Sequence, residues 1–185
     1  MTTAQDVLLS VLMKAGLDYL NPTVSSTDPQ VAEIVDLINE TGKDLALRGE
    51  WQAMLASSPV GPLPSDFGKP AIVVTGAGVH ARRVTDPGHW SFLAAAAPSH
   101  PYYRISNGAV EVVPAGPATL SYWSSHWSDA GESVSADGDA IYLPLVPMIS
   151  GALYRWLRKK GMPFDDQMAQ HEAEVAAAQK ADRGL

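Results

Sequence analysis

The prolines and glycines of this chain are concentrated in its middle, and their distribution constrains the fold more than any other feature. Most of the 14 prolines and 15 glycines lie between residues 57 and 140, where the apolar runs are also short. Because proline and glycine interrupt helices and mark turns, this stretch predicts short strands joined by loops. The segments on either side carry apolar residues at helical spacing. We therefore expect an α+β protein.

The N-terminal part predicts two helices. Apolar residues recur on one face between residues 4 and 15, where Thr3 is suited to cap the helix and Asp6 to lie in its first turn. A second helix is expected over residues 29–48, because an aspartate and a proline begin it and a glycine ends it. Gly42 costs this helix about 1 kcal/mol relative to alanine. We interpret it as a kink or a close helix crossing.

The middle predicts strands and one short helix. An Asn-Gly pair at residues 107–108 is typical of a tight hairpin turn. A helix is expected over residues 87–97, since Asp86 can cap it and a proline follows. Residues 129–139 are interpreted as a polar loop. The expected strands are residues 71–75, 79–84, 102–106, 109–113 and 120–123.

The last quarter is predicted to be helical again. A wide apolar stripe covers residues 145–157, and cations followed by glycine and proline end this helix. A final helix is expected over residues 165–181, and its apolar stripe is thin. Because an isolated helix of this length is only marginally stable, we expect it to pack against another surface. We expect a small helical bundle formed by both chain ends with a β-rich insertion between them. The predicted parts are residues 1–56, 57–142 and 143–185.

Composition narrows the function classes. The formal net charge of −7 argues against a general nucleic-acid binder. The absence of cysteine excludes disulfides, thiolate metal sites and cysteine catalysis, and it fits a reducing compartment. No run of apolar residues is long enough to span a bilayer.

Few sequence motifs indicate a catalytic, nucleotide-binding or metal-binding site. The segment Gly76-Ala77-Gly78 follows an apolar strand as in dinucleotide-binding loops, but the residues after it alternate as in a strand, so a glycine hairpin is the better interpretation. The histidines lack metal-binding spacing. Asp137 and Asp139 flank a glycine but lack the remaining ligands of a calcium loop, which favours a polar turn. We find no convincing nucleophile, metal cluster or phosphate loop.

A cluster of basic residues ends the helix at residues 145–160. One interpretation is that these cations stabilise the helix C-terminus and form a solvated face. The other is a docking patch for an acidic partner surface or phosphates. The cluster consists of Arg155, Arg158, Lys159 and Lys160.

Several stretches resemble one family in their order and spacing. They include the Leu-Pro-x-Asp-Phe motif at residues 63–67 and the segment Asp-Pro-Gly-His-Trp at residues 86–90. The chain resembles the head-to-tail connector (adaptor) proteins of tailed bacteriophages, in the group related to podophage tail tubular protein A. The resemblance covers residues 31–181. The other stretches that carry it are residues 36–53, 103–105, 111–115, 120–123, 137–144 and 153–164.

This resemblance implies a structural virion protein without catalytic activity or cofactor. Such adaptors form a ring, usually of twelve copies, beneath the portal, where they extend the DNA channel and attach the tail. The implied partners are the portal protein, a tail or nozzle protein and further copies of the chain, with genomic DNA in passage and no membrane. The implied location is the head–tail interface of the virion, after assembly in the host cytoplasm.

In related adaptors the C-terminal helix and tail engage the portal. The resemblance therefore implies that residues 164–185 and the basic cluster contact the portal or a neighbouring subunit. On that basis we predict that removing residues 164–185 leaves a folded monomer but abolishes portal binding. The predicted contact residues are Arg155, Arg158, Lys159, Lys160, Phe164, Met168 and Val175.

Three alternatives remain open at this point. The chain is either such an adaptor or another phage tail-completion or stopper protein. A small-ligand protein or enzyme would instead use the aromatic β region, and a DNA-binding module would use the basic cluster. A deep pocket with polar groups would favour the enzyme, and steep salt dependence would favour DNA binding.

Overall fold

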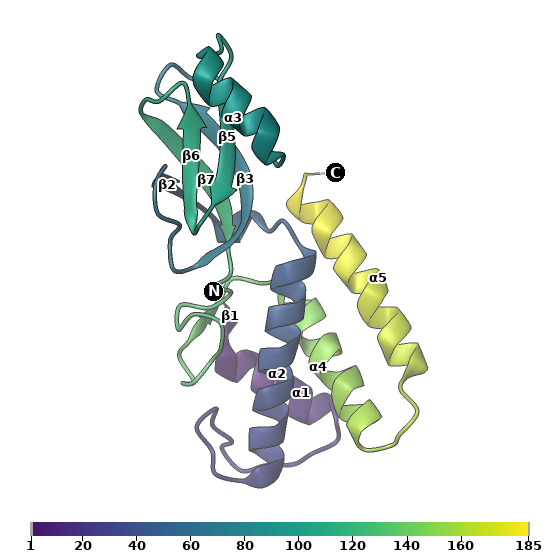
Figure 1. The fold of residues 1–185 in the computed structure, drawn as a ribbon. Helices are drawn as coiled ribbons and strands as arrows, with labels where there is room; N and C mark the ends of the chain where they lie inside the picture. Colours follow the sequence, from purple (N-terminus) through teal and green to yellow (C-terminus); the bar gives the residue numbers. More distant parts are fainter. Residues whose placement is uncertain (1, 185) are drawn as a thin grey trace. The chain divides into compact units, whose positions relative to one another are not determined.

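A computed structural model of the protein describes residues 2–184 (Figure 1). The chain divides into two compact units. The described residues up to 54 and from 125 onward form the helical unit, and Leu55–Ser124 form the β unit. Helices and strands occur in both, and the predicted α+β class is confirmed.

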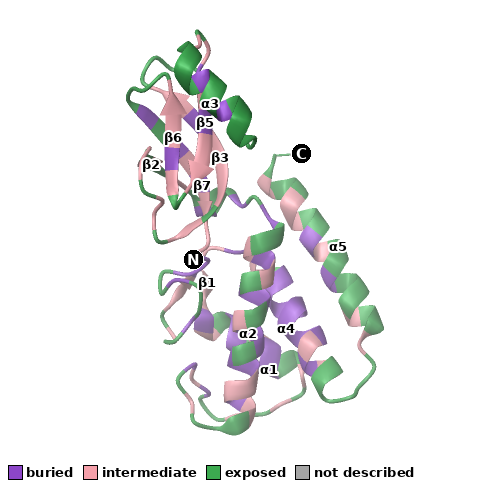
Figure 2. Cartoon of the chain, in the orientation of Figure 1, coloured by how far each residue is buried: buried purple, intermediate pink, exposed green. Residues whose placement is uncertain are grey.

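The helical unit is built from both ends of the chain. It contains α1 (Ala4–Lys14), α2 (Pro29–Arg48), α4 (Leu145–Lys159) and α5 (Asp165–Asp182), with a 3₁₀ turn at Gln52–Met54. Helix α4 packs against α1, α2 and α5, and its buried face is visible in Figure 2. The apolar stripes predicted from the sequence form this core.

The beginnings of α1 and α2 carry the predicted capping residues. The Thr3 side chain accepts a hydrogen bond from the backbone N–H of Asp6, and the Asp6 carboxylate accepts one from the backbone N–H of Thr3. This reciprocal pair lowers the pKa of Asp6, chiefly through the Thr3 backbone bond. Asp28 caps α2 by accepting hydrogen bonds from the backbone N–H groups of Gln30 and Val31.

Residues 125–142 belong to the helical unit, whereas the sequence analysis placed them in the insertion. The side chain of Trp127 is fully buried in the helical core. Strand β8 (Ala140–Ile141) pairs with β1 (Thr2–Thr3). The segment thus fills the helical core rather than extending a sheet of the β unit.

Side chains also tie this segment to the helices. Asn39 accepts a hydrogen bond from the backbone N–H of Val134 (2.8 Å), and Asp137 accepts one from that of Val24 (2.6 Å). Contacts between residues so far apart in sequence have no local pattern. That is why the boundary near residue 142 does not coincide with the edge of the compact unit.

The β unit contains two three-stranded sheets. In the first, β7 (Ala118–Ser124) lies between β2 (Leu55–Pro59) and β3 (Phe67–Thr75), and both pairings are antiparallel. In the second, β5 (Tyr102–Ser106) lies between β4 (Arg82–Arg83) and β6 (Ala109–Val113). Side chains from both sheets share one core, which includes Val73, Leu120 and Tyr103.

Helix α3 (Pro87–Ala96) forms a separate small cluster in the β unit. Its buried residues Trp90 and Leu93 pack with Val84, Tyr102 and Val113. Asp86 caps the helix by accepting from the backbone N–H of His89, as the Asp-Pro pair predicts.

In the β unit, two strands differ most from those expected. The expected strand 79–84 shrinks to β4, which pairs in parallel with β5. Strand β2 was not expected, because its sequence Leu-Ala-Ser-Ser-Pro lacks the β-branched and aromatic residues typical of strands. As an edge strand it tolerates the proline, and β7 supplies its pairing.

Candidate interaction surface

Arg155 joins α4 to α2. Its side chain is only 10% exposed, and its guanidinium lies 2.9 Å from the carboxylate of Asp44 and 3.3 Å from that of Glu40. It also donates to the backbone carbonyl of Gly151 and lies over the Tyr154 ring. Arg155 is therefore engaged inside the helical unit and does not offer its charge to a partner.

Lys159 and Lys160 share one partner on α2. Their ammonium groups lie 3.1 Å and 2.6 Å from the two carboxylate oxygens of Glu33. The hydrogen bond from Lys160, more than the other contributions, lowers the pKa of Glu33. Together with Arg155, these pairs fasten the end of α4 along α2.

Arg158 is the member of the basic cluster whose charge is free. It is exposed, and no described carboxylate forms an ion pair with it. Most of the cluster predicted as a docking patch thus serves internal pairing. A surface with one unpaired cation also gives little support to the DNA-binding alternative, which needs several phosphate contacts.

The three predicted contact residues near and on α5 have different environments. Val175 is buried in the helical core, Phe164 is half-buried at the start of α5, and Met168 is 40% exposed. Val175 cannot contact a partner while α5 stays docked. The members of the predicted contact set that reach the surface of the described chain are Arg158, Lys159, Lys160, Phe164 and Met168, and their contacts stay a prediction.

Sequence reasoning missed the polar group that anchors α5. His171 is fully buried, and its Nδ1 lies 3.1 Å from the hydroxyl of Ser150 on α4. Burial, more than the nearby Arg155 charge, lowers the pKa of His171. The spacing of Met168, His171 and Val175 at three and four residues would have placed it on the docking stripe.

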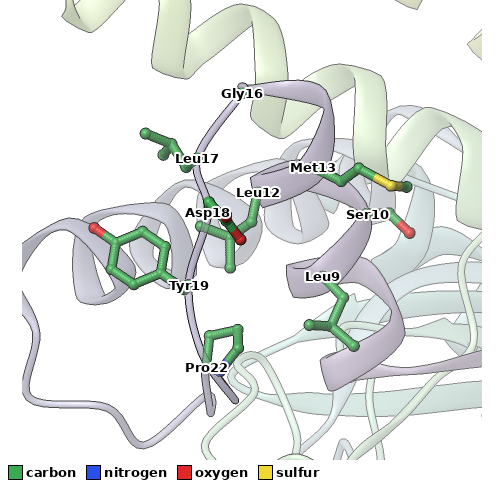
Figure 3. Close-up of a pocket in the computed structure, with 9 residues that line it drawn as sticks. All are labelled: Leu9, Ser10, Leu12, Met13, Gly16, Leu17, Asp18, Tyr19 and Pro22. Atoms are coloured by element: carbon green, nitrogen blue, oxygen red, sulfur yellow. The ribbon is translucent and has the colours of Figure 1, made fainter.

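An apolar hollow on the helical unit was also missed. It measures about 470 Å³ and is lined by α1 and the loop after it, including Leu9, Met13, Leu17 and Tyr19 (Figure 3). Met13 is 75% exposed. Because Leu9 and Met13 lie off the buried stripe of α1, the helix carries apolar residues on two faces.

The weak motifs of the sequence have structural roles. Gly76 to Gly78 form a turn in which the N–H of Gly78 donates to the carbonyl of Thr75, and Val74 bridges to His80. The carboxylate of Asp139 accepts from the backbone N–H groups of Ser135 and Ala136, which lowers its pKa. These geometries match the hairpin and polar-turn interpretations.

Residues 2–184 contain neither a metal-binding cluster nor a membrane-spanning helix. No group of three or more histidine or carboxylate side chains in this range is arranged to hold a metal ion. Within the same range, the helices are too short or too polar to cross a membrane.

Comparison with known proteins does not assign the chain to a family. No protein-family model matches it. No curated protein matches it either.

Proposed function

We propose that this protein is a head-to-tail adaptor of a tailed bacteriophage, which acts as a ring beneath the portal. The observation that carries the proposal is the architecture. Helices from both chain ends make one unit, and the β unit is inserted between α2 and α4. This is the order of elements that the resemblance over residues 31–181 implies.

The apolar hollow supports assembly with further copies. A ring needs two different surfaces on each subunit, one of which meets the other on the next copy. Exposed Leu9 and Met13 at the hollow, with Leu20 in the loop that follows, give the helical unit an uncovered apolar surface of the kind that marks protein contacts. We assign this surface to the contact between neighbouring subunits.

The net charge supports a role around a DNA channel. All of the negative charge excess stems from the helical unit, because the β unit contains four lysines or arginines and three acidic residues and so has a net charge of +1. An acidic ring repels DNA phosphates, so the duplex passes without binding.

Arg158 and Met168 are the proposed contacts with the portal. They are the exposed members of the predicted set that have no charged partner within the described chain. Lys159 and Lys160 remain secondary, because a partner would have to compete with Glu33 for them.

The test is to measure the molar mass of the protein alone and mixed with the portal ring of its phage, by size-exclusion chromatography with light scattering. We expect co-migration with the portal in a ring stoichiometry, which electron cryo-microscopy would count. Met168→Glu combined with Arg158→Glu should weaken this binding. Lys43→Glu, an exposed change of the same sign on α2 outside the predicted contact residues, is the matched control and should not.

Failure to bind the portal would contradict the adaptor assignment. If the protein instead occupied a position in the particle away from the portal, the tail-completion or stopper alternative would replace it.

A further inference from the structure

Helix α5 is held on the helical unit by few buried groups. Within α5, all of whose residues the structure describes, only His171 and Val175 are buried. Figure 1 shows α5 as the outermost helix of this unit, running along α4. A change that disfavours the burial of either side chain should therefore weaken the docking of α5.

The other attachments of α5 are at the surface. Glu172 pairs with Arg48 at 2.7 Å, and Asp182 accepts from the backbone N–H of Gln52 at 2.9 Å. Arg183 lies 3.7 Å from Glu50. Exposed ion pairs each contribute little, about 0–1 kcal/mol. They orient α5 but cannot compensate for the loss of a buried contact.

The packing around His171 leaves no room for adjustment. A Cβ atom at Gly151 on α4 would lie 2.8 Å from Cε1 of His171 and 2.5 Å from Cγ2 of Thr41 on α2. The ring centroid of Tyr154 lies 5.2 Å from that of His171. Three helices thus meet at Gly151, and the imidazole is enclosed between them.

The hydrogen bonds of His171 suit a neutral ring. Nδ1 has the Ser150 hydroxyl as its partner, while Nε2 is buried with no hydrogen-bond partner among the described residues. A protonated imidazole has two N–H donors and a positive charge, and here the charge would be buried with one donor, at Nε2, unsatisfied.

We propose that His171 makes the docking of α5 pH-sensitive: the helix is held while the imidazole is neutral and is released when it is protonated. The release is local to α5, while α1, α2 and α4 stay packed. This inference depends only on the packing of α5, so it holds whatever the chain assembles with.

The charged groups around His171 do not cancel this effect. From α4, the guanidinium of Arg155 disfavours the protonated ring, and from α2 Arg48 does the same. Asp44 on α2 and Glu172 on α5 favour it. Glu174, one turn along α5, accepts from Gln170, and its second oxygen is buried. Asp44 and Glu172 each already pair with an arginine, so neither is free to stabilise an imidazolium.

The direction of the pH dependence follows from linkage. Docking lowers the pKa of His171, so the docked state binds fewer protons than the released state. Docking is strongest above the pKa of the released residue, which is ordinarily about 6.5. It weakens as the pH falls below that value, by up to about tenfold per pH unit.

Native-state hydrogen exchange tests the proposal on the full-length protein. Corrected for the intrinsic pH dependence of exchange, the protection of α5 amides should fall about tenfold between pH 7.5 and 5.5. The protection of α2 amides should not fall in parallel. A parallel loss would show that the whole helical unit opens, and it would overturn local release.

His171→Gln removes the titrating group and keeps a polar side chain. Its α5 protection should not depend on pH in this range. His89→Gln, at an exposed position in the β unit, is the matched control and should behave like the wild type. If His171→Gln kept the wild-type pH dependence, the proposal would be wrong.

A measurement on the wild-type protein avoids dependence on the variant folding. The imidazole proton resonance of His171, followed by NMR, should titrate below the ordinary histidine value. An ordinary or raised pKa of His171 in the docked state would also contradict the proposal.

Discussion

The indole ring of Trp127 occupies the space that a side chain at Gly42 would fill. A Cβ atom there would lie 2.5 Å from Cε2 of the ring, and Trp127 is fully buried. From the sequence alone, Gly42 indicates a kink or a close helix crossing. The structure shows a third one: a tryptophan from the segment that precedes α4 packs directly on the α2 backbone.

We therefore expect Gly42→Ala to destabilise the protein, although alanine is the better helix former. Overpacking a rigid buried ring costs about 1–3 kcal/mol, and the helix propensity returns at most about 1 kcal/mol. Urea unfolding measures the difference. Gly138→Ala, where a Cβ meets no atom within 4 Å, is the control and should be near neutral.

Arg155 should matter more to stability than Lys160, although both pair with acids on α2. Arg155→Met leaves Asp44 partly buried with fewer partners, and we expect a loss of about 1–3 kcal/mol in the free energy of unfolding. Lys160→Met should cost less than about 1 kcal/mol, because Glu33 keeps Lys159 and the pair is more exposed. Equal losses would show that Arg155 is not the main link between α4 and α2.

Asp137 should stabilise the protein through one long-range hydrogen bond. Its carboxylate accepts from the backbone N–H of Val24, and Asp137→Ala leaves that N–H without its partner. We expect a cost of about 1–3 kcal/mol in thermal or denaturant unfolding. Asp137→Asn keeps an acceptor oxygen and should cost clearly less. A similar loss of stability in both variants would mean that the negative charge of Asp137, rather than its hydrogen bond with Val24, stabilises the protein.

The β unit should lose stability at alkaline pH through Tyr122. Burial, aided by the hydrogen bond that its hydroxyl donates to Asp66 at 2.9 Å, raises the pKa of Tyr122 to about 12. The raised value means that this stabilisation is complete below pH 10 and is lost as the pH rises through about 12.

The comparison to make is between the wild type and Tyr122→Phe. The free energy of unfolding at pH 9.5 and 11.5 should fall more in the wild type than in the variant, because phenylalanine does not ionise. Equal falls in the two proteins would assign the alkaline loss to other groups.

Removing residues 164–185 is a poor test of whether they bind the portal. The prediction made above is that removing residues 164–185 leaves a folded monomer that no longer binds the portal. In the structure that change removes buried His171 and Val175 and uncovers Ser150 and Tyr154, which are buried. Surface substitutions at Arg158 and Met168 separate binding from folding, and for that reason they carry the test of function.

The sequence by itself determined the helices and most strands, because their causes are local. Capping residues lie next to the helices they begin, and α2 has its expected bounds, Pro29–Arg48. The Asn-Gly turn fixes the hairpin of β5 and β6, since both residues adopt the positive φ that this turn requires.

Only the tertiary structure decided which distant residues meet. Strand β2 exists because β7 pairs with it, and Trp127 joins the helical core because Gly42 leaves room for its ring. The guanidinium of Arg155 forms ion pairs within the helical unit because Asp44 and Glu40 face it from α2. These contacts join residues far apart in the chain, and a pattern of neighbouring residues does not encode such partners.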